Sequence, residues 1–115
     1  MAAYRASSAA LRAAFAGSGV LERGFRSLLG SATGAERLQI RLYDLLAHGR
    51  DLARAAGVPA RRPEDLAEES LAFARDRLPS SSRTGRFAEP RPVADAAPAI
   101  DRLAAFLGRP VPWRR

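Results

Sequence analysis

The sequence predicts an all-α protein, a small bundle of four or five helices around a central helix at about residues 34–56. Apolar side chains recur at helical spacing through most of the chain. Ile and Val are scarce, and no alternating apolar run exceeds a few residues, so no strand is predicted. At 115 residues the chain is expected to form a single helical domain over 1–115.

Two helices are expected ahead of the central one. The first has one face formed by Tyr4, Ser8, Leu11 and Phe15, at spacings of four, three and four residues. Residues 17–19 are Gly-Ser-Gly and end it. A second, shorter helix that ends near Gly30 is predicted from Leu21, Phe25, Leu28 and Leu29.

The central helix has the clearest signals of the chain. Thr33 and Glu36 form a T-x-x-E capping box, in which each residue can satisfy a backbone N–H at the helix start. Two apolar rows then repeat every seven residues: Leu38, Leu45 and Leu52, and Leu42, Gly49 and Ala56. Such a seam predicts close packing against other helices. Gly57 and Pro59 predict its end.

Gly49 is the unusual residue of this seam. A glycine within a helix costs about 1 kcal/mol relative to alanine. Because the apolar rows keep their register across Gly49, a continuous helix is favoured, with a close helix crossing at this position. The alternative is a helix break after His48, which would favour a helix-turn-helix arrangement.

A second apolar strip lies on the opposite side of the central helix. Ile40, Tyr43 and Ala47 form it, on a projection of 100° per residue. A surface helix is normally polar there, so the central helix is either covered on both sides by the rest of the chain or exposed to a partner protein, which these residues would contact. Trp113, in a basic tail over 109–115, is a second candidate partner anchor; the alternative is that it folds back on the last helix.

The remaining elements are a fourth helix, a loop and a short last helix. Pro63 suits the first turn of the fourth helix, which Pro79 ends. Ser and Pro predict a loop over about 79–98. The last helix has an apolar face formed by Ile100, Leu103, Ala104 and Leu107.

Charge supports a nucleic-acid partner only weakly. The formal net charge is +7, and every basic side chain except His48 is Arg; a GC-rich coding sequence would produce the same bias. The alternative function is a nucleic-acid-binding regulator with a helix-turn-helix-like segment at 50–66. Its candidate phosphate contacts are Arg50, Arg54, Arg61 and Arg62. Against it, the following helix starts with Glu64, Asp65, Glu68 and Glu69, which phosphates repel.

No catalytic, metal or cofactor site is predicted. His48 has Asp44 four residues before it and Asp51 three after it, but a metal site needs three or four ligands. The chain has no Cys. The favoured function is therefore a small non-enzymatic helical adaptor or accessory subunit that binds another protein.

The expected partner is a protein or a second copy of the chain, with no membrane contact. No apolar run approaches the roughly 18–20 residues of a membrane span. A cytoplasmic location is expected. The alternative is mitochondrial, because residues 1–21 contain Arg and Ser but no acid, as in a transit peptide.

Overall fold

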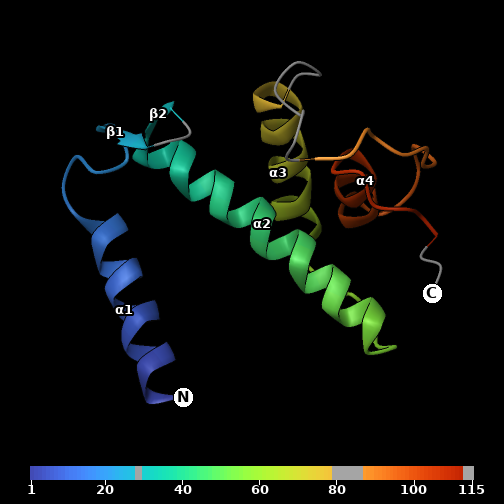
Figure 1. Ribbon diagram of the computed structural model, residues 1–115, viewed down its shortest axis with the longest axis horizontal. Helices are drawn as coiled ribbons and strands as arrows, with labels where there is room; N and C mark the ends of the chain where they lie inside the picture. Colours follow the sequence, from blue (N-terminus) through green and yellow to red (C-terminus); the bar gives the residue numbers. More distant parts are fainter. Residues whose placement is uncertain (28–29, 79–86, 113–115) are drawn as a thin grey trace. The chain divides into compact units, whose positions relative to one another are not determined.

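The computed structural model describes residues 1–27, 30–78 and 87–112 (Figure 1). Over these residues it contains four helices and a two-stranded antiparallel sheet. The protein is therefore mixed α/β, and the all-α prediction was wrong. Two compact units can be distinguished, Met1–Ile40 and Arg41–Arg115. The single-domain organisation expected from chain length stays a prediction.

The first unit begins with the expected helix and continues with a β-hairpin in place of the second. Helix α1 spans Ala2–Ala16. Strands β1 (Gly24–Ser27) and β2 (Gly30–Thr33) then pair antiparallel, with Phe25 opposite Ala32. A helix over about 21–30 was therefore the wrong prediction; Leu28 and Leu29, on which it partly rested, lie outside the described residues. Helices this short are marginal alone, whereas Gly30 adopts a positive φ of 102° that suits a hairpin.

Helix α2 (Gly34–Ala55) starts at the predicted capping box. The Thr33 amide donates to Glu36 Oε2 at 2.7 Å, and the Glu36 amide donates to Thr33 Oγ1 at 3.1 Å. Arg37 fixes the hairpin to this helix end, because its Nη2 donates to the carbonyl oxygens of Phe25 and Gly30, at 3.2 and 3.3 Å. The helix runs unbroken through Gly49, as predicted.

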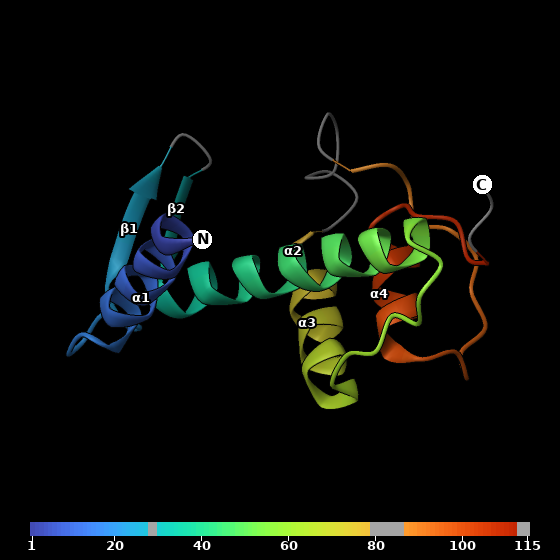
Figure 2. The same cartoon turned by 90° about the horizontal axis from the view of Figure 1, so that it is seen from below.

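The second unit packs the later part of α2 with two further helices. Helices α3 (Glu64–Arg77) and α4 (Ala99–Phe106) lie side by side in both views (Figures 1 and 2). Most of their buried side chains are small, namely Ala67, Ser70, Ala74, Ala99, Ala104 and Ala105. Leu71, Leu103 and Ile100 fill the space between them. Small residues let the helices approach closely, which gives this unit a core despite few large apolar groups.

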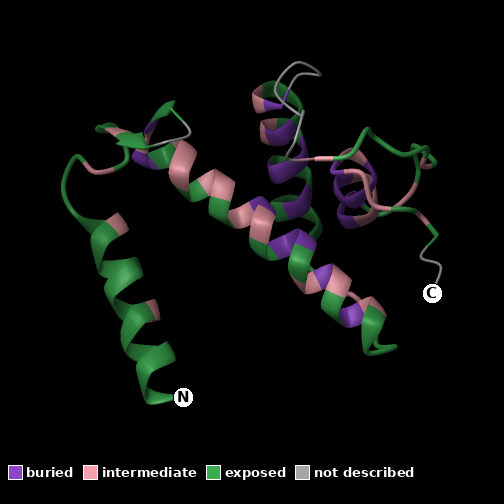
Figure 3. Cartoon of the chain, viewed as in Figure 1, coloured by how far each residue is buried: buried purple, intermediate pink, exposed green. Residues whose placement is uncertain are grey.

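The face that α2 buries is the reverse of the predicted one. Tyr43, Leu46, Ala47, Arg50 and Ala53 are buried, and they recur at spacings of three, one, three and three residues (Figure 3). The Tyr43 ring lies 6.3 Å from that of Phe73 in α3. The predicted packing row is instead exposed at Leu38, Leu45 and Leu52.

The segment between α3 and α4 has no helix or strand over 87–98, as expected for the predicted loop. Its earlier part, 79–86, lies outside the described residues. Phe87 joins the segment to the core, because its ring meets that of Tyr43 edge to face at 6.4 Å. The Arg91 amide donates to the Ala105 carbonyl at 2.8 Å. These contacts place Phe87 and Ala88 beside α2 and the end of α4.

Candidate protein-binding surface

The outward face of α2 in the second unit is an apolar strip of leucines. Leu45 and Leu52 are 69% and 72% exposed. They lie two turns apart with Gly49 between them, and half-buried Leu42 is one turn before Leu45. We call these four residues the leucine surface. Exposed leucines repeated at heptad spacing are typical of a face that packs against another helix.

Behind this surface, α2 is attached to α4 by a buried arginine. Arg50 is fully buried, and its Nε donates to Asp101 Oδ1 at 2.7 Å. Arg54 Nη2 reaches the same oxygen at 3.5 Å. Two guanidinium nitrogens of Arg50, Nη1 and Nη2, have no hydrogen-bond partner within the described part of the chain. A buried charge is costly unless paired, so Asp101 is essential to the position of this helix.

The acidic first turns of α3 hold the start of α4. Glu64 Oε1 accepts a hydrogen bond of 2.7 Å from the Ala99 amide, which belongs to the first turn of α4. Glu68 forms a two-point ion pair with Arg102, with Nη1 to Oε2 at 3.3 Å and a second contact from Nη2 to Oε1. The hydrogen bond from Arg102, assisted by the charges of Arg102 and Arg75, holds the pKa of Glu68 below its usual value. The same bond raises the pKa of Arg102. Glu64 and Glu68 therefore join α3 to α4.

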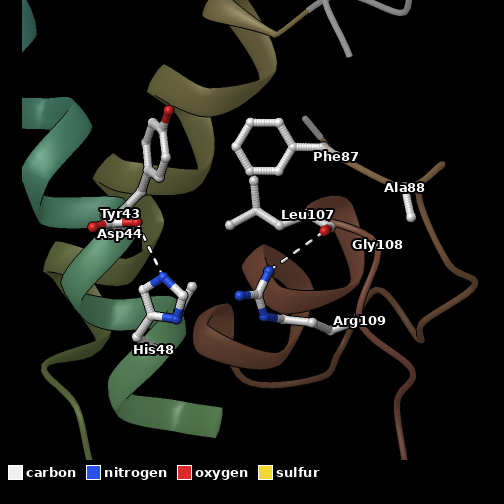
Figure 4. Close-up of a pocket in the computed structure, with 9 residues that line it drawn as sticks. Tyr43, Asp44, His48, Phe87, Ala88, Leu107, Gly108 and Arg109 are labelled. Atoms are coloured by element: carbon white, nitrogen blue, oxygen red, sulfur yellow. Dashed lines mark hydrogen bonds and ion pairs between the residues drawn. The ribbon is translucent and has the colours of Figure 1, made fainter. Parts of the chain in front are cut away.

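A pocket of about 480 Å³ lies in the second unit (Figure 4). Its lining consists of Tyr43, Asp44, Ala47, His48, Phe87, Ala88, Leu107, Gly108 and Arg109. Tyr43 and Phe87 lie at one end of the view, and His48 and Arg109 at the other. α2 supplies one wall, and the loop and the residues after α4 supply the other.

The charged groups of this pocket are paired with one another or with a neighbour. His48 Nε2 lies 3.3 Å from Asp44 Oδ1, and its Nδ1 lies 3.9 Å from Asp51 Oδ2. Arg109 Nε donates to both oxygens of Asp51, at 3.0 and 2.8 Å. Over residues 1–27, 30–78 and 87–112, no group of three or more His, Cys, Asp or Glu side chains is arranged to hold a metal ion.

The predicted partner-contact residues do not form an accessible face. Tyr43 and Ala47 are 8% and 2% exposed, because they pack into the core of the second unit, so the chain itself covers them; contact with a partner through these residues stays a prediction. Ile40 is half-buried at the end of the first unit. Trp113 lies outside the described residues.

The predicted nucleic-acid contacts are divided between the core and the surface. Arg50 is buried on Asp101 and is not available to a phosphate, which corrects its predicted role; Arg54 pairs with the same carboxylate. Arg61 and Arg62 are exposed. Residues 56–63 connect α2 to α3, which is longer than the three- or four-residue turn of a helix-turn-helix. The described geometry does not favour the regulator hypothesis.

The sequence pattern does not identify Asp101, and it predicts that Leu45 and Leu52 are packed against other helices of the chain, whereas both are exposed. A partial signal for Arg50 exists, since it falls three and seven residues after Ala47 and Tyr43 and thus shares their face. Nothing in the local pattern identifies Asp101, which lies 51 residues further along the chain.

Comparison with known proteins gives similarity but no function. Two uncharacterized proteins of Mycobacterium tuberculosis, from strain CDC 1551 / Oshkosh and strain H37Rv, are each 37% identical over 113 residues. The match covers 96% of this chain and 62% of each relative, so the chain spans less than two thirds of their length. No family model and no solved structure matches the chain. Among the described helices, none has both the length and the apolar character needed to cross a bilayer.

Proposed function

We propose that this protein is a small non-enzymatic helical adaptor or accessory subunit that binds another protein through the leucine surface of α2. The observation that carries the proposal is the exposure of Leu45 and Leu52 on the side of α2 that faces away from the core. Burying a leucine side chain stabilises a complex by about 1.5–3 kcal/mol, so two such residues are a substantial source of affinity. A cytoplasmic location, with a mitochondrial one as the alternative, stays a prediction.

The pocket supports catalysis less well than the leucine surface supports binding. Its polar side chains are Tyr43, Asp44, His48 and Arg109. Arg109 is engaged by Asp51, and Asp44 and His48 lie within 3.3 Å of each other. A histidine with a carboxylate is half of a general acid–base arrangement, but the described lining provides no nucleophile beside it. We therefore favour binding over an enzymatic role.

Site-specific photo-crosslinking in the source organism tests the proposal. A photoreactive amino acid replaces Leu45, and in a matched control it replaces Ala72, an exposed residue of α3. We expect a discrete covalent adduct with one protein from position 45 and none from position 72. The adduct is identified by mass spectrometry, and the same protein, purified, should bind the unmodified chain.

The crosslinking result should also depend on the leucines. Leu52→Ser removes apolar area from the surface without disturbing the core, so the adduct from position 45 should weaken while the circular dichroism spectrum stays unchanged. If position 45 yields no adduct, or the same adducts as position 72, the leucine surface is ordinary solvent-exposed helix and the proposed function is wrong.

A further inference from the structure

One edge of the leucine surface is formed by an arginine, Arg62, which has no acidic partner among the residues that the structure describes. The guanidinium of Arg62 lies against Gly49, where an added Cβ would meet Nη2 and stand 3.2 Å from Cζ. Gly49 is four residues after Leu45 and three before Leu52, so Arg62 lies beside both leucines. Its Nη1 donates to the Arg61 carbonyl at 2.7 Å. Among the residues that the structure describes, neither Arg62 nor Arg61 forms an ion pair with a carboxylate.

The opposite edge differs, because its charges are already matched. His48 lies between Asp44 and Asp51, and Arg41 Nη1 reaches Asp44 Oδ2 at 3.8 Å. Asp44 therefore has Arg41 as a local cation, and Asp51 has Arg109, whose Nε lies 2.8 Å from Oδ2. Among the described residues, the positive charge beside the leucine surface that lacks a carboxylate partner is therefore that of Arg62.

We propose that the occupant of the leucine surface is an acidic amphipathic helix of a partner protein. This inference rests on the proposed function and adds the chemistry of the partner. Leu42, Leu45 and Leu52 have the spacing of a helix seam and would receive an apolar row of the partner. Glu or Asp side chains beside that row would meet Arg62. Charge complementarity of this kind selects the partner and fixes its register.

Designed peptides test the inference directly. The probe is a fluorescent helical peptide of roughly 21 residues, about six turns, with Leu at heptad seam positions and Glu at the flanking positions. Its matched control has Lys in place of every flanking Glu. Fluorescence anisotropy with the full chain at about 0.15 M salt should give at least about tenfold tighter binding of the acidic peptide.

Three variants separate the contributions of charge and apolar area. The double variant Leu45→Ser/Leu52→Ser should weaken binding of the acidic peptide by more than about tenfold, because both leucines lose their buried area. Arg62→Glu should reverse the preference toward the Lys peptide. Arg91→Glu has the same net charge but its change lies in the loop before α4, so it should leave the preference unchanged.

Each outcome discriminates between the two proposals. Equal, leucine-dependent binding of both peptides overturns the acidic partner and leaves the protein-binding surface intact. The inference is also overturned if neither peptide binds, or if the leucine substitutions leave the affinity for the acidic peptide unchanged. Photo-crosslinking at position 45 tests the proposed function separately. A molecular mass that rises with concentration and returns to that of a monomer in Leu45→Ser/Leu52→Ser identifies a second copy as the occupant, which also overturns the inference.

Discussion

At the scale of single residues, the group that packs against Gly49 differs from the one that the sequence predicts. The sequence predicts a close helix crossing, but the nearest group is the tip of the Arg62 side chain. A helix backbone resists displacement, whereas an exposed guanidinium on a flexible stem does not. Because of this difference, Gly49→Ala is expected to stabilise the protein, whereas a close helix crossing would make the same substitution destabilising.

Gly49→Ala is expected to stabilise the protein by about 0.5–1 kcal/mol, because alanine has the higher helix propensity and Arg62 can move aside. Chemical denaturation measures the change. In an Arg62→Ala background the gain should be at the upper end of that range, since nothing then has to move. A loss of about 1 kcal/mol or more would mean that the site is tightly packed after all.

At the scale of the elements, the junction between the β-hairpin and α2 is the most constrained part of the first unit. Gly34 is buried, and its amide donates to the Arg23 carbonyl at 3.0 Å. A Cβ at this position would overlap the Val20 carbonyl oxygen and lie 3.0 Å from Leu21 Cα. These atoms belong to the backbone, so they cannot yield as a side chain can.

Gly34→Ala is therefore expected to destabilise the first unit by about 1–3 kcal/mol through overpacking, against the gain that helix propensity alone predicts. Hydrogen exchange of the amides over 30–37 reports the effect locally. Gly24→Ala is the matched control, because its Cβ would meet only Ser31 Oγ, at 3.9 Å. Equal protection in the two variants would contradict the close approach at Gly34.

The helices could be predicted from the sequence because their signals are local. Thr33 and Glu36 identify the start of α2, and Pro63 marks the start of α3 within one residue. The hairpin was missed because Phe25 and Leu21 also fit a helical spacing. The orientation of α2 was missed because both of its faces are apolar, and only the small residues of α3 and α4 decide which face is buried. Periodicity shows that a strip exists but not which neighbour covers it.

At the scale of the whole molecule, two adjacent residues of α4 link this helix to the two other helices of the second unit. Asp101 binds Arg50 and Arg54 of α2, and Arg102 binds Glu68 of α3. The first pair is buried and the second is at the surface. Their contributions to stability therefore differ in size and in pH dependence.

Asp101→Asn is expected to cost about 3–5 kcal/mol, because it leaves the charge of Arg50 buried without a carboxylate. Arg50→Met should cost much less, since it removes the buried charge and retains the volume. Urea denaturation compares the two with Asp76→Asn, an exposed change at the end of α3 expected to stay within about 0.5 kcal/mol. Equal losses in the first two variants would contradict this account of the pair.

The Glu68–Arg102 pair should make stability depend on pH on the acid side. The pKa of Glu68 is lower in the folded protein than its usual 4.5, so the carboxylate contributes fully above that value. Its contribution is lost as pH falls from about 4.5 through the lower folded-state pKa. Denaturation from pH 7 to pH 3 should therefore show a smaller acid loss in Glu68→Gln, with the two curves converging at low pH. Glu89→Gln, in the exposed loop, should follow the wild type; parallel curves for Glu68→Gln and wild type would exclude the effect.

The Glu64 contact to the Ala99 amide leads us to expect a particular order of folding in the second unit. Helix α4 is eight residues long, its N-cap residue Pro98 provides no side-chain acceptor, and its first-turn partner is 35 residues upstream. A helix this short is marginal alone in water, so we expect α4 to form after α3. An excised peptide over 95–110 should consequently give a coil spectrum by circular dichroism, and the last helix should be the slowest part of the second unit to gain amide protection during refolding.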